Sequence, residues 1–379
     1  MICFCFLIAI VAGIDGRLGP NFTNVLRRRR INAGGNVIVV AIGARRFDRF
    51  IRVVEKNANV IFVGRVTRCV TFEIPISDVD KIAREPGLLV VDIDAQIAWA
   101  PPQTVGRRRA EPAPSMRDVA KRLRVGETRD FDGSGVSISV LDTGFTDHAF
   151  IRNENVVARE SFAPTSRTPT DLVGHGVGII SEILGSDPER LPGLACGAKV
   201  ISAKIFDDDG GTTIGSIVKA LDFGLARGAH VFNLSFGGRM PHPVLHEVIR
   251  HCHAAGVLIA AAAGNDGPDV GTLSYPARYP EVFSVGATDK RGNLTPWSSR
   301  GEPGRYGPDI CLEGESLVLA RATGTTMGEP IDDHLTSTSG TSFSAPLAAC
   351  LAALLIQRNP KLRPEEIRVL LRSACVPVD

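Results

Sequence analysis

Residues Thr338–Pro346 read TSGTSFSAP, and the apolar run Leu347–Ile356 follows them directly. The serine among small residues at the head of this run, Ser342, falls at the N-terminus of a predicted helix. Unpaired N–H groups and the positive dipole end of a helix favour a developing negative charge, so such a turn can present a nucleophile and help to hold an oxyanion. An N-cap serine on a core helix explains a Gly-Thr-Ser tripeptide equally well by itself. The nucleophile hypothesis therefore needs a base, an acid and a second oxyanion donor elsewhere.

Candidates for these roles follow one another along the chain. The segment VSISV at 136–140 alternates like a strand and leads to Asp142, at a strand's carboxyl end, where open α/β sheets build their sites. His175 stands between two glycines at the head of the apolar segment Val177–Leu184, and Asn265 ends the run AAAGN. The chain thus holds an acid, a base, an amide donor and a serine in that order.

Five ordered segments resemble the subtilisin-like serine proteases, namely those around Asp142, His175, Asn265 and Ser342, and NLSFGG at 233–238. Asp, then His, then Ser is the chain order of that family. The resemblance runs from about Val119 to the end of the chain. The local segments GNDGP at 264–268, SSRG at 298–301 and PDI at 308–310 are more similar to the site-one protease and pyrolysin-like branches than to bacterial secreted subtilisins.

This resemblance implies a role for each matching residue. Ser342 would attack the peptide carbonyl, His175 would carry the proton, and Asp142 would orient the imidazole. Asn265 would donate its side-chain amide to the oxyanion. An extended substrate would pair with two segments, which are Asp209, Gly210 and Gly211 and then Ser235, Phe236 and Gly237. The substrate residue before the scissile bond would enter a pocket walled by Ala262, Ala263 and Gly264. The chemistry requires no cofactor.

Length and composition allow roughly two globular domains, with 379 residues, 44% hydrophobic and 22% charged. A formal net charge of +2 indicates no specialisation for nucleic acid, so we expect protein or peptide substrates as partners. The apolar run Met1–Gly13 indicates a signal peptide within residues 1–16 and a secreted or secretory-pathway protein. It lacks a basic n-region, so a misassigned start or a buried strand are alternatives. Because Gln357 and Arg358 interrupt the apolar run after Ser342, we expect no transmembrane anchor.

The residues before the family-like region form a separate pattern. Strand and helix signals give a β-α-β-β-α-β order over 36–94, the ferredoxin-like split arrangement. In front of a subtilisin-like domain this resembles an inhibitory prodomain whose tail occupies the substrate cleft, which implies a zymogen. We expect this prodomain at 34–100, a proline- and arginine-rich linker at 101–118 and the peptidase domain at 119–379. The tail 95–115 is expected to be a solvated, cleavable connector.

Within the peptidase region, strand and helix signals alternate. The predicted strands are 200–206, 230–235, 257–263 and 282–287, and the predicted helices are 214–227 and 243–255. This βα alternation predicts an α/β fold with a doubly wound, mostly parallel sheet. Asn359-Pro360 closes the helix after Ser342, and Pro364 opens the last helix.

Three observations limit the metal and redox hypotheses. The 8 cysteines include no Cys-x-x-Cys pair, so zinc is not indicated and the redox compartment stays open. The histidines His242, His246, His251 and His253 cluster around one helix without a ligand pattern, so we expect no metal there. The loop 185–195 holds Asp187 and Glu189 but lacks the asparagine-rich calcium pattern of bacterial subtilisins, which leaves structural calcium possible and unsupported.

Two departures and one charge run affect the expected activity. The family usually has threonine and often a second histidine after the His-Gly pair, whereas this chain has Val177 and Gly178, which predicts altered activity. The run Asp207–Asp209 next to Gly210 could favour arginine or lysine upstream of the scissile bond, whereas turn chemistry alone explains it equally well. The basic runs 27–30 and 107–109 would then be processing sites.

Of two other functional classes, the sequence argues against one and leaves the other open. Asp142-Thr143-Gly144 is also an aspartic-protease tripeptide, but those enzymes need two such carboxylates and the chain contains no second tripeptide of this type. A catalytically silent relative that binds peptides is the second alternative. Such relatives usually lack a member of the triad or the oxyanion amide, and all four residues are present here.

Overall fold

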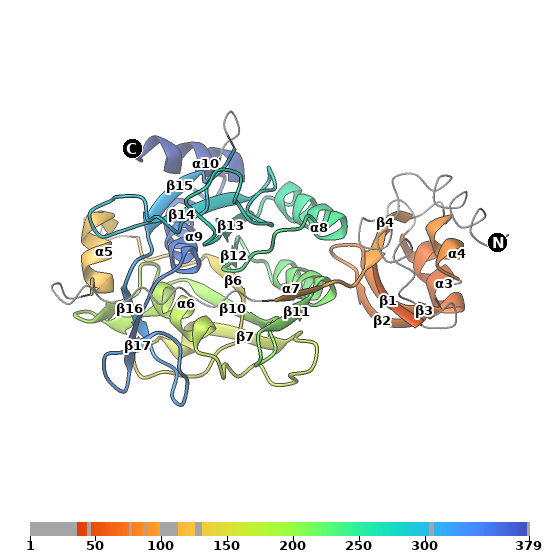
Figure 1. Cartoon of the computed structure of the whole chain (residues 1–379), viewed down its shortest axis with the longest axis horizontal. Helices are drawn as coiled ribbons and strands as arrows, with labels where there is room; N and C mark the ends of the chain where they lie inside the picture. The colour runs from red at the N-terminus through yellow and green to blue at the C-terminus, as the bar shows by residue number, and fades with distance from the viewer. Residues whose placement is uncertain are drawn as a thin grey trace.

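The computed structural model of the chain describes residues 36–43, 47–75, 78–85, 88–98, 113–125, 131–302 and 307–376. The predicted signal peptide, both arginine runs and most of the predicted linker lie outside these residues. The described part forms a small N-terminal module (residues 36–98) and a larger body (residues 113–376), as Figure 1 shows.

The N-terminal module has the predicted β-α-β-β-α-β order. Its elements are β1 (Asn36–Gly43), α3 (Phe47–Asn57), β2 (Asn59–Gly64), β3 (Cys69–Pro75), α4 (Val79–Ala83) and β4 (Leu88–Ile93). The strands form an antiparallel sheet of order β2-β3-β1-β4. Alternate residues of β1, such as Val39 and Ala41, pack with Phe50 and Val54 of α3 into the module's own core. The ferredoxin-like arrangement of this module is therefore confirmed.

The larger body is built on a seven-stranded parallel sheet, which confirms the predicted α/β class. Its order is β15-β14-β13-β12-β6-β10-β7. The strands are β6 (Ser137–Asp142), β7 (Val156–Ser161), β10 (Lys199–Lys204), β12 (Val231–Leu234), β13 (Leu258–Ala262), β14 (Phe283–Thr288) and β15 (Ile310–Glu313). Each neighbouring pair is parallel. All seven carboxyl ends therefore lie along one edge.

Helices cover both faces of this sheet, because the strands are apolar on both sides. The helices on one face are α6 (His175–Leu184), α9 (Thr341–Arg358) and α10 (Pro364–Ser373), and those on the other are α7 (Ile214–Ala226) and α8 (Pro243–Ala254). Strand β13 shows the alternation: Leu258, Ala260 and Ala262 join the first core, whereas Ile259 and Ala261 join the second. The remaining pieces are η3 (Asn153–Asn155), β8 (Ser186–Asp187), β9 (Leu191–Pro192), β16 (Leu317–Ala320), β17 (Glu329–Pro330) and β18 (Leu335–Thr338).

The prediction of a solvated connector at 95–115 is wrong for the residues that the structure describes at its two ends. Residues Gln96–Ala98 form a strand, β5, that pairs antiparallel with β11 (Gly211–Thr213) of the body. Helix α5 (Met116–Arg122) begins inside the expected linker, with Ser115 as its N-cap. Because Met116 is fully buried in the body's core, α5 belongs to the body.

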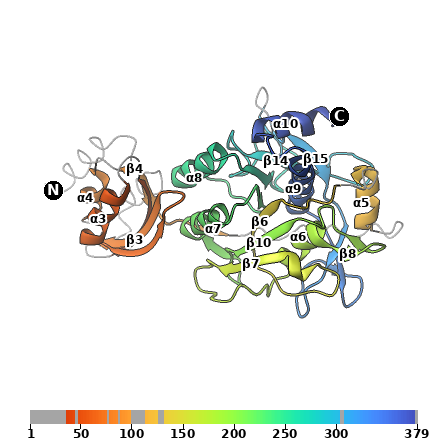
Figure 2. The same cartoon turned by 180° about the vertical axis from the view of Figure 1, so that it is seen from behind.

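The N-terminal module lies against α7 and α8, as Figure 2 shows. The N–H and the hydroxyl of Thr67 both donate to one oxygen of Asp222 on α7, at 2.7 and 2.9 Å. At the first turn of α7 the Gly215 N–H donates to Asp94, at 2.6 Å. Polar contacts at both ends of α7 therefore fix the module's orientation.

Helix α9 departs from the sequence expectation about membrane spans. Within the described residues it is the one helix long and apolar enough to cross a membrane by length and composition. It is 72% buried and packs against the sheet, so these properties belong to a core helix.

Candidate active site

Four predicted site residues come from separate elements at the carboxyl edge of the sheet. Asp142 ends β6, His175 begins α6, Asn265 follows β13 by three residues, and Ser342 is the second residue of α9. Parallel strands deliver their carboxyl ends to one edge, and helices packed on one face begin there, so distant sequence segments meet.

Asp142 and His175 form a buried pair. The His175 Nδ1 lies 2.7 Å from an Asp142 oxygen, and each residue is 1% exposed. The Thr143 N–H donates to the same Asp142 oxygen at 2.7 Å. A carboxylate held in this way fixes the imidazole ring so that Nε2 is the nitrogen available for proton transfer.

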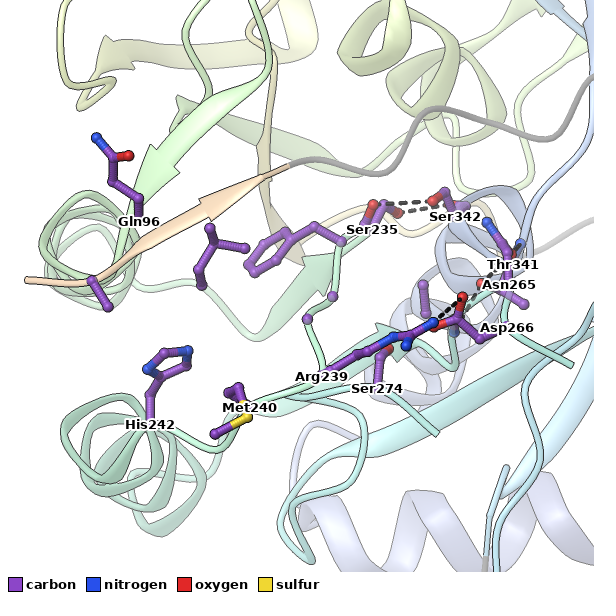
Figure 3. Close-up of a pocket in the computed structure, with 17 residues that line it drawn as sticks. Gln96, Ser235, Arg239, Met240, His242, Asn265, Asp266, Ser274, Thr341 and Ser342 are labelled. Carbon is purple, nitrogen blue, oxygen red and sulfur yellow. Dashed lines mark hydrogen bonds and ion pairs between the residues drawn. The ribbon is translucent and has the colours of Figure 1, made fainter. Parts of the chain in front are cut away.

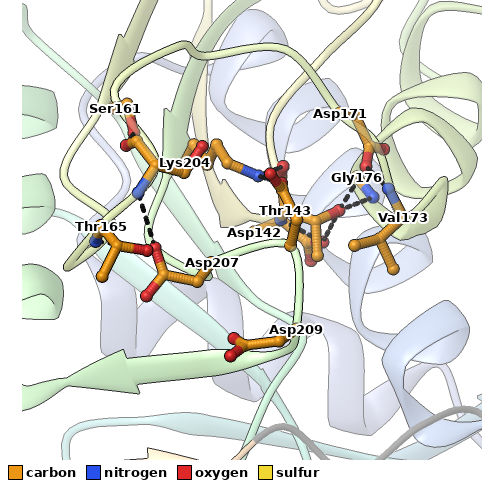
Figure 4. A network of polar contacts seen from close by, with 12 residues as sticks. Asp142, Thr143, Ser161, Thr165, Asp171, Val173, Gly176, Lys204, Asp207 and Asp209 are labelled. Carbon is orange, nitrogen blue, oxygen red and sulfur yellow. Dashed lines mark hydrogen bonds and ion pairs between the residues drawn. The ribbon is translucent and has the colours of Figure 1, made fainter.

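A second carboxylate, Asp171, is hydrogen-bonded to residues that adjoin this pair in the sequence (Figure 4). One Asp171 oxygen accepts from the Thr143 hydroxyl at 2.9 Å and from the Gly174 N–H at 2.8 Å, and the other accepts from the Val177 N–H at 2.9 Å. The Gly176 N–H in turn donates to the Thr143 hydroxyl, at 2.8 Å. Burial raises the pKa of Asp171, against these hydrogen bonds. The network ties the first turn of α6 to the end of β6.

The residues around His175 explain the two departures from the family pattern. A Cβ on Gly176 would lie 2.1 Å from the Gly144 carbonyl oxygen, so only glycine fits there. A Cβ on Gly178 would lie 3.1 Å from the methyl group of Met327, which occupies the space a larger side chain would need. Val177 is fully buried in the core. Both unusual residues therefore pack within this chain without displacing His175.

Ser342 is joined to the neighbouring strand end by two hydrogen bonds. Its hydroxyl donates to the Ser235 carbonyl at 3.1 Å, and the Ser235 hydroxyl donates to the Ser342 carbonyl at 2.7 Å. This exchange places the start of α9 beside the segment that follows β12. The His175 ring lies 5.1 Å from the ring of Phe343, the next residue of α9.

Asn265 is oriented by Thr341. Its side-chain oxygen accepts from the Thr341 N–H at 3.0 Å and from the Thr341 hydroxyl at 2.9 Å (Figure 3). Since the oxygen is held by two donors, the NH₂ group is the end left to face the cleft. The sequence alone did not indicate a role for Thr341, although this residue directly precedes Ser342.

A pocket of about 470 Å³ lies beside Ser342. Predicted site residues in its lining are Ser235, Phe236, Gly237, Ala262, Gly264, Asn265 and Ser342. Ala263 is buried in the core on the other face, and its carbonyl accepts from the N–H of Ser274. Ser274 also lines the pocket. It was not predicted as a site residue, because no periodicity or motif in the sequence marks it.

The acidic run Asp207–Asp209 is largely engaged within the protein. Asp207 accepts from the N–H groups of Thr165 and Ser166, both at 2.8 Å. Asp208 pairs at 2.9 Å with Lys204, whose side chain is 0% exposed and also donates to the Thr143 carbonyl. Asp209 is exposed and accepts a local hydrogen bond from the Gly211 N–H, at 3.1 Å. Two of the three carboxylates thus have structural partners.

The described residues show no group of three or more His, Cys, Asp or Glu side chains that could hold a metal. In the loop considered for calcium, Asp187 accepts from the N–H groups of Glu189 and Arg190, and Glu189 pairs with Arg117. Both carboxylates of this loop therefore have partners within the protein. His246 stacks on Tyr279 and His253 pairs with Glu365, as expected for structural residues, whereas His242 lines the pocket beside Ser342.

Comparisons with known proteins agree with this architecture. A family model described as the subtilase family matches residues 133–376. The chain is 31% identical to an alkaline protease of Alkalihalobacillus alcalophilus over 305 residues, 79% of this chain and 72% of the relative. It is 33% identical to subtilisin Savinase of Lederbergia lenta over 246 residues, 65% of this chain and 85% of the relative. The first match covers 305 residues, which is more than the segment 113–379 contains, so it includes part of the N-terminal module.

Proposed function

The chain belongs to the subtilase family and is a serine endopeptidase, and we propose that Asp142, His175 and Ser342 are its catalytic triad. The observation that carries the proposal is the buried 2.7 Å contact between Asp142 and His175 beside the N-terminus of α9. A buried contact between a carboxylate and an imidazole has little structural advantage, because desolvation of the carboxylate offsets the attraction. A functional role explains why the pair of Asp142 and His175 lies at the carboxyl edge of the sheet, where the other candidate site residues also lie.

Each member has a distinct task in this mechanism. Ser342 attacks the substrate carbonyl, and His175 takes the hydroxyl proton and later returns it to the leaving amine. Asp142 holds the imidazole and stabilises the imidazolium. No cofactor takes part in these steps.

The oxyanion is stabilised by donors that are already oriented. The amide of Asn265, held by Thr341, and the Ser342 N–H in the first turn of α9 would face the developing charge. Fixed donors of this kind cost no reorganisation when the charge forms.

We further propose that the N-terminal module is the inhibitory prodomain of a secreted zymogen. The support is that β5 pairs with β11 as an added antiparallel strand, and that Ala95, Gln96 and Ile97 line the pocket beside Ser342. A substrate that paired with Gly211 would have to displace this strand. Cleavage within the proline-rich tail 95–115, after β5, would release the inhibitor.

A preference for basic residues upstream of the scissile bond would rest mainly on Asp209. Asp207 and Asp208 have partners within the protein, and Asp209 remains exposed next to the paired strand β11. Charge-assisted hydrogen bonds to arginine are the interaction that one exposed carboxylate can supply.

Labelling with a fluorophosphonate probe tests the central proposal. After release of the N-terminal module, the wild-type protein should be labelled at Ser342 and should cleave peptides, whereas Ser342→Ala should do neither. A wild-type protein that binds peptides but takes no label would support the catalytically silent alternative instead.

A further inference from the structure

Lys204 is buried beside the turn that follows Asp142. It is the last residue of β10, directly opposite Asp142 in the parallel pairing of β10 with β6, and its side chain is 0% exposed. Its Nζ donates to the Thr143 carbonyl at 2.7 Å and pairs with Asp208 at 2.9 Å, and Figure 4 shows the side chain extending towards Thr143. Removing an ammonium group from water is costly even when it is paired, so its place here needs a reason.

Two successive residues of β10 hold two successive carbonyls of this turn. The Ile205 N–H donates to the Asp142 carbonyl at 2.8 Å, and Lys204 donates to the Thr143 carbonyl. The other polar groups of Thr143 are also engaged, because its N–H donates to the Asp142 carboxylate and its hydroxyl donates to Asp171. The backbone that carries the Asp142 side chain is therefore fixed from several sides, and Lys204 supplies one of these contacts.

Lys204 also brings a positive charge close to the pair of Asp142 and His175. The other charged side chain tied to this turn is Asp171, and the first turn of α9 contributes uncharged side chains. A buried cation favours the ionised form of a neighbouring carboxylate and disfavours a second positive charge on a neighbouring imidazole. Asp208 offsets part of this effect, although its side chain is 41% exposed and solvent screens it.

We propose that Lys204 is a positioning residue for the catalytic triad, with Asp208 as its counterion. It holds the Asp142–Thr143 turn and keeps the Asp142 carboxylate ionised, and its complete burial keeps it away from the substrate. This inference rests on the proposed function, because it takes Asp142 and His175 as the proton-transfer pair.

Lys204→Met removes the ammonium group and retains a long apolar stem. Because the turn loses one of its contacts, kcat should fall by roughly tenfold to hundredfold with little change in KM. Without the cation, His175 should bind a proton more readily and so lose activity at a higher pH. The acidic limb of the profile of kcat against pH should therefore move up by roughly 0.3–1 pH unit.

Asp208→Asn should move the same limb in the opposite direction. It leaves the charge of Lys204 uncompensated, so His175 should stay neutral to a lower pH. The double variant Lys204→Met/Asp208→Asn should return the limb close to its wild-type position while kcat stays low. A role of Lys204 in folding alone predicts none of these shifts.

The test uses variants made as the full-length chain and assayed on one peptide after release of the N-terminal module, with kcat and KM measured across the pH range. The matched control is Lys199→Met, the same substitution at the exposed, amino-terminal end of β10, which should change neither kcat nor the profile. Acidic limbs that coincide in wild type, Lys204→Met and Asp208→Asn, or that move in the same direction in both variants, overturn the inference.

The possible failures are distinguishable. If a thermal melt shows that Lys204→Met does not fold, Asp208→Asn decides by itself, and a limb that stays in place or moves to higher pH overturns the inference. A wild-type protein that cleaves no peptide and takes no fluorophosphonate label at Ser342 overturns the proposed function together with the inference.

Discussion

Asn265 and Thr341 are joined by two hydrogen bonds, both accepted by the Asn265 side-chain oxygen at 3.0 and 2.9 Å. Thr341 directly precedes Ser342, so one residue links the start of α9 to the amide that would bind the oxyanion. The orientation of the Asn265 amide therefore depends on the turn that presents the serine.

We predict that Thr341→Val lowers kcat by roughly twofold to tenfold with little change in KM, because it removes one of two hydrogen bonds that orient the donor. Asn265→Ala should lower kcat by about 10²–10³, a value known for the equivalent donor of a subtilisin. Steady-state kinetics of the double variant provide the control. If Thr341 acts through Asn265, adding Thr341→Val to Asn265→Ala should cause little further loss.

Asp142, His175 and Ser342 should behave as one unit. Ser342→Ala and His175→Ala should each reduce kcat by a factor on the order of 10⁶, and combining them should cost little more. Asp142→Asn should be less severe, by analogy with other triads. Single-turnover assays with each purified variant would measure this, and independent, multiplying effects would contradict a triad.

We expect substitution of Asp207 to change stability and substitution of Asp209 to change substrate specificity. Asp207→Ala removes the acceptor of two backbone N–H groups, so we expect a loss of roughly 1–3 kcal/mol in the free energy of unfolding and unchanged substrate preference. Asp209→Asn should leave the melting temperature near wild type and reduce any preference for upstream arginine in a peptide library. The charge hypothesis is wrong if wild type cleaves basic and neutral sequences equally.

Asp222→Ala should loosen the N-terminal module, because it removes the acceptor of both Thr67 hydrogen bonds. In the full-length, unprocessed chain this should increase the rate of fluorophosphonate labelling of Ser342. Asp48→Ala, which breaks an exposed pair with Arg65 within the module, is the control. Equal labelling rates for Asp222→Ala and wild type would argue against an inhibitory module.

Glu182 should make stability depend on pH. It is 0% exposed in α6, neither carboxyl oxygen has a hydrogen-bond partner among the described residues, and burial raises its pKa well above the ordinary value. The group is therefore neutral in the folded protein at pH values where the unfolded chain is ionised. Below about pH 4.5 the carboxyl group is protonated in both the folded and the unfolded chain, so Glu182 does not change the free energy of unfolding with pH. As pH rises from there towards the folded pKa, the free energy of unfolding falls by about 1.4 kcal/mol per pH unit.

Glu182→Met should remove this dependence, since an apolar side chain of similar length has no proton to lose. Denaturant melts at pH 4 and pH 8 should show the variant gaining stability over wild type mainly at pH 8. A gain of equal size at both pH values would show that Glu182 is ionised, or partnered, in the folded state.

Local sequence patterns determined the order of elements in this protein. Alternation at 136–140, the apolar segment after His175 and the run after Ser342 predict strands and helices, because burial selects side chains at the period of each element. Gly176, next to His175, also marks a close approach of two backbone segments, because a Cβ there would collide with the Gly144 carbonyl oxygen. From these patterns the fold class and the four candidate site residues could be named in advance.

Which side chains meet depends on the tertiary structure. Nothing near Asp207 in the sequence indicates that Thr165 is its partner, and no motif joins Ser274 to Ala263 or Thr67 to Asp222. These contacts join residues brought together by the packing of separate strands and helices. Periodicity records whether a side chain is buried, whereas the identity of its neighbour depends on how whole elements pack, and that is a property of the complete fold.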